Sequence, residues 1–268
     1  MVKFFVLLLL CASQLVAAKV PLREKQPDFQ LLVHANKTAN FFYTLDHLAG
    51  STKSHRAISD RYRQTWATEV GFEADDDRYL ANFRLLRLEG KKKRKRPSVH
   101  RPLRTSLTPP STTAEELYAT CFFKASSLKE AFDLLKTICQ KDDKHIERLA
   151  RVFAHFAKRF DTLFAKRKAK LLKLNKEFSQ RVLMSQLGPF LDEVAAFYRA
   201  RVDDKTIFVN IMWAPPRIAH ATTAGNHMVI PLPDDHDWTD EFIVSRLGVV
   251  AHESAHYLFG SISEELKG

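Results

Sequence analysis

Hydrophobic residues recur at steps of three and four through two long parts of the chain, residues 19–89 and 114–202. In the first part, apolar and aromatic side chains gather at Phe41–Leu48. In the second part, Ile146–Phe164 forms a long phenylalanine-rich stripe. Because this spacing places side chains on one helical face, both parts are predicted to be helical regions, with a break at Gly188-Pro189.

The period of the pattern changes in the last quarter of the chain. Thr206–Trp213 is rich in β-branched and aromatic residues and predicts a strand that stops at the following prolines. Asn226–Ile230 predicts a second strand, and Glu241–Gly260 predicts a helix capped by Thr239 or Asp240. We therefore expect an α+β fold, in which a mostly helical N-terminal region is followed by a small antiparallel sheet packed on the last helix.

Composition narrows the class of protein. Of the 268 residues, 45% are hydrophobic and 27% are charged, which is typical of a globular chain rather than a disordered one. Residues 90–113 differ, because they carry the basic run Lys91–Arg96 and four prolines but no acid. This segment is predicted to be a disordered loop between the two helical regions, and residues 203–268 are predicted to form a separate core.

The net charge of +11 suggests contact with polyanions. Lys91–Arg104 holds much of this charge and could make a weak polyanion contact, although a merely solvated loop is the favoured interpretation. The helical segment 158–181 is also cationic. Its charged face lacks aromatic residues for base stacking, so no specific nucleic-acid partner is expected.

Residues 1–18 are typical of a secretory signal peptide. Lys3 is followed by the apolar run Phe4–Leu10, and Val16 and Ala18 are the small residues at the two positions that a signal peptidase reads. Cleavage is predicted after Ala18, giving a secreted or periplasmic protein without a transmembrane segment; an N-terminal anchor helix is the alternative.

The cysteines leave two readings open. Cys11 would be lost with the signal peptide, while Cys121 and Cys139 would remain. They could form a disulfide in an oxidising compartment or stay as two buried thiols. Asn36-Lys37-Thr38 has the pattern of a glycosylation acceptor.

The last predicted helix carries the candidate chemistry, His252-Glu253-Ser254-Ala255-His256. His252 and His256 are one turn apart, so both imidazoles can bind one ion, and neutral imidazole suits Zn²⁺. Glu253 can take a proton from a zinc-bound water and pass it to a leaving amine. The helix is apolar on nearly all sides, which predicts burial in a domain centre, where these polar groups would need a metal. The alternative is an exposed helix with ordinary polar residues four apart.

This helix, following a strand, resembles the catalytic core of the zincin metallopeptidases over about residues 205–260. The resemblance implies zinc-dependent hydrolysis of a peptide or protein substrate, with His252 and His256 as ligands and Glu253 as the general base. It also implies an edge strand that pairs with substrate, for which residues 224–230 are the candidate. Asn226 and His227 would then face the cleft and bind substrate.

Two features depart from the family pattern. Phe259 and Ile262 stand where metzincins have glycine and a third histidine, which leaves a gluzincin-like site. Gluzincins take a third ligand from a downstream glutamate, and only Glu264 and Glu265 remain. On an unbroken helix Glu264 lies about 12 Å beyond His256, so we expect the third ligand and half of the cleft in a missing C-terminal part.

Other observations keep alternatives open. His220, His227 or His236 could substitute as ligands, although their spacing does not argue for it. The acids of 234–241 could form a rim that favours basic substrates, or they could simply cap the helix. The absent third ligand and the basic segments also fit a second hypothesis, a non-catalytic zincin-like protein or a secreted polyanion-binding protein.

Overall fold

The computed structural model describes residues 28–51, 56–89, 114–198, 200, 202, 204–218, 221–234 and 239–260. The predicted signal peptide, the basic segment 90–113 and Glu264 and Glu265 lie outside these residues. The described part is mostly helical, with a small four-stranded mixed sheet, so the α+β class is confirmed. None of the described helices has the length and apolar character needed to span a bilayer.

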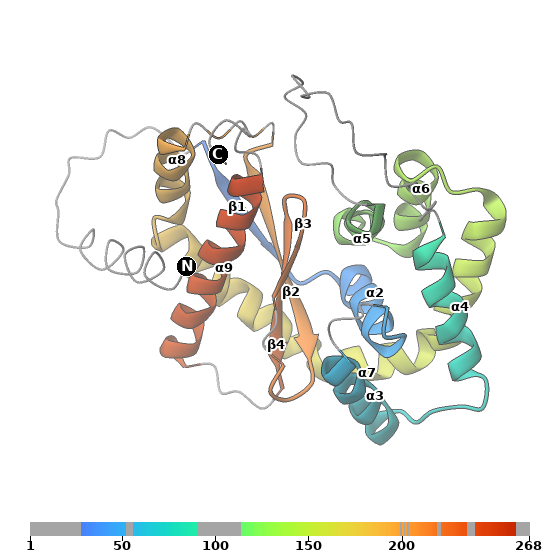
Figure 1. Ribbon diagram of the computed structural model, residues 1–268. Coiled ribbons are helices and arrows are strands. Elements are labelled where there is room, and N and C mark those ends of the chain that lie inside the picture. Colours follow the sequence, from blue (N-terminus) through green and yellow to red (C-terminus); the bar gives the residue numbers. More distant parts are fainter. Residues whose placement is uncertain are drawn as a thin grey trace.

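Figure 1 shows the arrangement of the elements. The helices are α2 (Lys37–Leu48), α3 (Arg56–Glu69), α4 (Asp76–Leu88), α5 (Ala114–Lys124), α6 (Leu128–Ile138), α7 (Asp143–Met184), α8 (Leu187–Phe197) and α9 (Asp240–Gly260). The strands are β1 (Gln30–His34), β2 (Thr206–Ala214), β3 (Thr222–Ala224) and β4 (His227–Pro233).

The sheet has the order β1-β2-β4-β3 and is not antiparallel as the sequence had suggested. β1 is parallel to β2 and β2 is parallel to β4, while only β3 and β4 are antiparallel. β3 reverses the chain between β2 and β4, so two strands close in sequence become parallel. β1 comes from the N-terminal region 19–89, for which only helices were predicted.

Helices lie on both sides of the sheet. α8 and α9 are on one side, and α2, α3 and α5 are on the other (Figure 1). The long helix α7 passes the sheet and packs with both groups: Phe160 stacks on Phe41 of α2 with ring centroids 4.2 Å apart, and the C-terminal half of α7 contacts α9. The sheet is therefore buried between helical layers, and α9 packs on β3 and β4.

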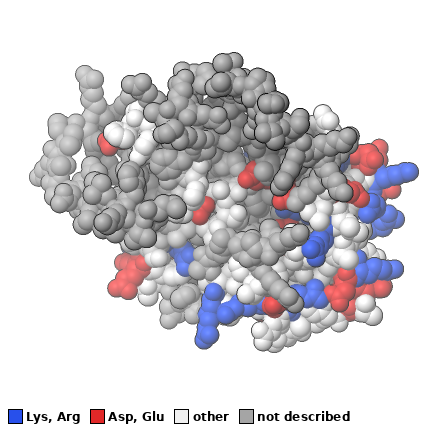
Figure 2. Space-filling model, in the orientation of Figure 1, with Lys and Arg blue, Asp and Glu red and all other residues white. Residues whose placement is uncertain are grey.

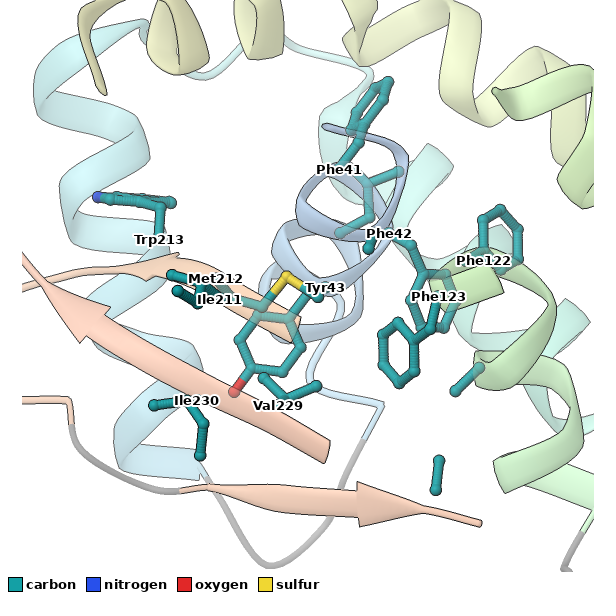
Figure 3. Packing of buried hydrophobic residues seen from close by; sticks show 14 of the residues in the cluster. Phe41, Phe42, Tyr43, Phe122, Phe123, Ile211, Met212, Trp213, Val229 and Ile230 are labelled. Carbon is teal, nitrogen blue, oxygen red and sulfur yellow. The ribbon is translucent and has the colours of Figure 1, made fainter. Parts of the chain in front are cut away.

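Helix α2 is the centre of the core, and every residue in it except Lys37 is buried. Phe42 stacks on Phe122 of α5 with ring centroids 4.4 Å apart. Figure 3 shows Tyr43 of the same helix pointing toward the strands. Asn40 continues the hydrogen bonding of β2 where β1 ends, since its side chain donates to Ile211 O at 3.1 Å and accepts from Trp213 N at 2.8 Å. This helix thus joins the sheet to the helical region.

The helix boundaries have local causes. Asn36, Ser127 and Asp142 cap α2, α6 and α7, each accepting a hydrogen bond from a backbone N–H of the first turn. The break predicted at Gly188-Pro189 occurs slightly earlier, at Gln186, whose φ of 57° is left-handed. Pro189 stands inside the first turn of α8, where its missing N–H removes no helical hydrogen bond.

Candidate metal-binding site

Helix α9 begins at the predicted cap. Thr239 Oγ1 accepts a hydrogen bond from Phe242 N at 3.2 Å. Val250, Ser254 and Leu258 form the buried face of the helix. His252 and His256 lie on the opposite face and are exposed. The prediction that α9 is buried in a domain centre is therefore wrong, and burial does not require a metal at these residues.

The two imidazoles converge on one point. Their Nε2 atoms are 3.1 Å apart, and the rings are nearly perpendicular, with an interplanar angle of 86°. Two imidazole nitrogens at this distance need a proton or a cation between their lone pairs. A zinc ion at the usual distance of about 2.0–2.1 Å from both would subtend an N–Zn–N angle of roughly 100°, close to tetrahedral geometry. The pair thus fits a shared zinc ion.

Glu253 follows the first histidine and projects from the side of the helix. Its side chain is half-buried. Among the described residues, it has no hydrogen-bond or ion-pair partner, so its carboxylate is available as a proton acceptor. The backbone of α9 alone thus brings the two imidazoles together and places Glu253 next to the first of them in the chain.

A hydrogen-bonded junction at Asp204 anchors this end of α9 to the sheet. Tyr257, next to His256, donates from its hydroxyl to Asp204 O at 2.8 Å. The Asp204 carboxylate accepts from Thr206 N at 2.8 Å and from Asn226 Nδ2 at 2.8 Å. We call these four residues the Asp204 junction. It connects the candidate site to the start of β2 and to the β3–β4 turn, a role that the sequence did not indicate.

Asn226 therefore has a structural place in the described structure. Its Nδ2 also donates to Thr206 O at 2.9 Å, so both protons of the amide are used within the junction. Asp204 links Asn226 to Tyr257, so Asn226 lies near the histidine end of α9, as expected for a residue close to the site. Its contacts are those of a positioning residue rather than of a substrate-binding one.

The structure does not bring His227 to the α9 site. The side chain is 1% exposed and stacks on Phe208 with ring centroids 4.5 Å apart, near Phe123 of α5. α5 and α9 lie on opposite sides of the sheet (Figure 1). Burial, with smaller effects from Lys124 and His34, lowers the pKa of His227 to about 3, which keeps the ring neutral.

The edge strand also differs from the prediction. β4 pairs with β2 on one side and with β3 on the other over residues 227–229, so this part of the segment 224–230 is internal. Within the described sheet, the edge beside α9 is β3 instead. α5 approaches this edge, since Thr120 Oγ1 lies 3.5 Å from Ala224 O. A peptide that adds to the sheet beside α9 would have to pair with the short strand β3.

A third metal ligand is not found beside the histidine pair among the described residues. Among those residues, three possible ligand groups converge at a different place, formed by Glu73, Asp76 and His155. The other candidates from the sequence, His220, His236, Glu264 and Glu265, lie outside the described residues. The site as described therefore has two candidate ligands and one adjacent candidate base.

In the second cluster, Asp76 is already paired with the guanidinium of Arg159. Asp76 is fully buried and accepts hydrogen bonds from both terminal nitrogens of Arg159, at 2.6 and 2.7 Å, and from His155 Nε2 at 2.6 Å. Burial raises the pKa of Asp76, but the hydrogen bonds from Arg159 outweigh it and the pKa is lowered. A metal ion would have to displace the guanidinium, so we assign this cluster a structural role.

Two of the described acids of segment 234–241 are also engaged. Asp234 accepts from Arg167 of α7 and, at 2.7 Å, from Trp213 Nε1. Asp240 forms an ion pair with Arg181. These contacts favour packing and helix-capping roles over an acidic rim that selects substrates.

Among the described residues visible in Figure 2, Lys and Arg are interspersed with Asp and Glu. On α7, Lys166 lies 3.5 Å from Glu69 and Lys173 lies 3.8 Å from Glu177. This mixture is typical of a solvated helix face. The other basic segment, Lys91–Arg104, lies outside the described residues.

Comparisons of the chain with protein-family models, curated proteins and solved structures found no match. They therefore show no family for the chain. What α9 does has to be inferred from its own geometry.

Proposed function

We propose that His252 and His256 bind one zinc ion and that the protein is an exported zinc-dependent peptidase with Glu253 as its general base. The observation that carries the proposal is the convergence of two Nε2 atoms 3.1 Å apart, with an unengaged half-buried carboxylate beside them in the described structure. The resemblance of this helix to zincins supplies the reaction class.

In this proposal the chain's own residues orient the reactants and move the proton. Bound zinc supplies a Lewis acid, which lowers the pKa of a water and polarises the scissile carbonyl. Glu253 accepts the proton of the attacking water and delivers it to the leaving amine. The Asp204 junction fixes the histidine end of α9 against the sheet, and the exposure of both imidazoles leaves the site open to a peptide.

Catalytic zinc sites commonly have three protein ligands. Since the described residues contribute two, the proposal requires a third ligand from outside them. Because that ligand would come from elsewhere in the chain, the first measurement is the zinc affinity of the full chain.

The metal test titrates the chelator-treated full chain with zinc and compares it with two ligand variants. One zinc per chain is expected for the wild type. His252→Ala and His256→Ala should each weaken binding at least about tenfold, equivalent to about 1.4 kcal/mol. His34→Ala, which removes an exposed histidine of β1, is the matched control and should bind normally. Equal zinc binding by all four proteins, or none by the wild type, would contradict the proposal.

The activity test follows cleavage of a random peptide library. Glu253→Gln should lose about 10²- to 10⁴-fold of the hydrolysis rate, the usual contribution of a general base, while retaining zinc. Glu241→Gln is the control, because it alters the other glutamate of α9 about 18 Å away along the helix. Hydrolysis that is unchanged in Glu253→Gln would remove this residue as the base.

A non-catalytic protein is the second candidate function. It is favoured by the exposure of both imidazoles and by the absence of a third ligand among the described residues. Zinc binding without cleavage of any library peptide would support it. A polyanion-binding function would appear as heparin affinity that falls steeply with salt and depends on Lys91–Arg104.

A further inference from the structure

Cys121 and Cys139 lie side by side although they belong to different helices. Cys121 is in α5 and is fully buried, and Cys139 is the half-buried C-cap of α6. Their sulfur atoms are 3.8 Å apart. We propose that these two thiols form a disulfide that fastens α5 to the end of α6.

The surroundings favour a disulfide over the other uses of paired thiols. A bond of about 2.05 Å requires the sulfur atoms to approach by roughly 1.8 Å, and Cys139 stands at the end of its helix, where a small adjustment is easiest. A thiolate metal site needs more ligands, and no Asp, Glu or His joins these two cysteines in a ligand cluster among the described residues. The pair is thus neither a complete metal site nor two unrelated core thiols.

The oxidation can proceed by exchange with an external disulfide such as oxidised glutathione. The hydrogen bond from Cys121 lowers the pKa of the half-buried Cys139, so Cys139 is the first nucleophile. Its thiolate attacks the glutathione disulfide, releases one glutathione thiolate and forms a mixed disulfide. Cys121 then loses its proton and attacks the Cys139 sulfur, which releases the second glutathione. Two protein thiols are oxidised and one external disulfide is reduced.

The disulfide would restrain helix α5, which packs against the edge strand β3. Thr120, next to Cys121, contacts Ala224 O of β3, and Phe123 lies beside His227 of β4. Fastening α5 to α6 therefore restrains the helix that lies along β3. Because the cross-link closes a short loop, oxidation should raise the unfolding midpoint by about 5–10 °C.

The test counts free thiols in the full chain carrying Cys11→Ser, so that Cys121 and Cys139 are its only cysteines. After incubation with oxidised glutathione, the denatured protein should accept no maleimide, and it should accept two after reduction. Cys139→Ser in the same background is the matched control and should retain no internal bond, so that reduction leaves one maleimide per chain. Two maleimides without reduction, or a glutathione adduct that persists on Cys139, would overturn the proposal.

A second measurement requires no cysteine variant at the pair and compares the oxidised and reduced forms of the same protein. Thermal unfolding should show the higher midpoint for the oxidised form. Identical midpoints would overturn the claim that the bond fastens α5. Because the oxidant is added in solution, both measurements are independent of export and of zinc binding.

Discussion

His227 should make the protein sensitive to mild acid. The ring is 1% exposed, and among the described residues its Nε2 has no hydrogen-bond partner that could stabilise a positive charge. Its pKa is lowered to about 3 by burial first and then by the charges of Lys124 and His34. In the unfolded chain an ordinary histidine has a pKa of about 6.5. At pH values between these two pKa values, the unfolded chain therefore binds a proton at His227 that the folded chain does not bind.

The sign and size of the effect follow from this difference. Stability is fully present above pH 6.5 and is lost as the pH falls toward 3, because protonation stabilises only the unfolded state. Each pH unit below 6.5 costs about 1.4 kcal/mol, so about 2 kcal/mol is lost at pH 5. Carboxylates whose pKa is lowered by ion pairs, such as Asp76 and Glu69, add their own loss at more acidic pH.

Urea unfolding at pH 7 and pH 5 isolates the contribution of His227. His227→Leu removes the titrating ring but leaves every other ionisable group in place, so the difference between the two pH values should be about 2 kcal/mol smaller than in the wild type. The comparison cancels any uniform effect of the substitution on packing. An equal loss in both proteins would mean that His227 is solvated, as a substrate-binding residue in a cleft would be.

Three further substitutions test the core and the motif helix by urea unfolding. Asn40→Ala should destabilise the fold by about 3 kcal/mol, because it leaves Ile211 O and Trp213 N unpaired inside the protein. Arg87→Ala should cost about 3–5 kcal/mol, since it strips a buried carboxylate of its guanidinium partner at 2.9 Å. Ser254→Ala should change stability by less than about 0.5 kcal/mol and leave zinc affinity unchanged, because in the described structure the buried hydroxyl makes no hydrogen bond.

Local patterns predicted most of the helices, and they failed where pairing depends on distant residues. α9 begins at the expected cap, and β2 starts at the expected Thr206, because capping and β-branched runs are local signals. β1 was missed, since the short apolar run Leu31-Leu32-Val33 fits a helix as well as a strand. Its strand character comes from pairing with β2, where Gln30 aligns with Thr206 far along the chain.

The candidate site also combines features that local sequence predicts with features that depend on distant residues. The convergence of His252 and His256 is a property of one helical turn, so sequence spacing was enough to predict it. The surroundings of Asn226 and His227 depend on the register of β4 and on the β3–β4 turn. The sequence pattern places both residues in one strand, where neighbours point to opposite faces and could not both have faced one cleft. His227 begins the strand and points toward α5, while Asn226 remains in the turn beside Asp204.

The exposure of the histidine pair changes the reason for expecting a metal there. Burial would have made an ion necessary for folding, whereas exposed imidazoles are stable without one. Their positions are set by the backbone of α9 and by the Tyr257–Asp204 hydrogen bond, one residue beyond His256. The two candidate ligands are therefore preorganised without an ion. Zinc binding would then require no rearrangement of this turn of the helix, and by linkage it would stabilise the folded chain in proportion to its affinity.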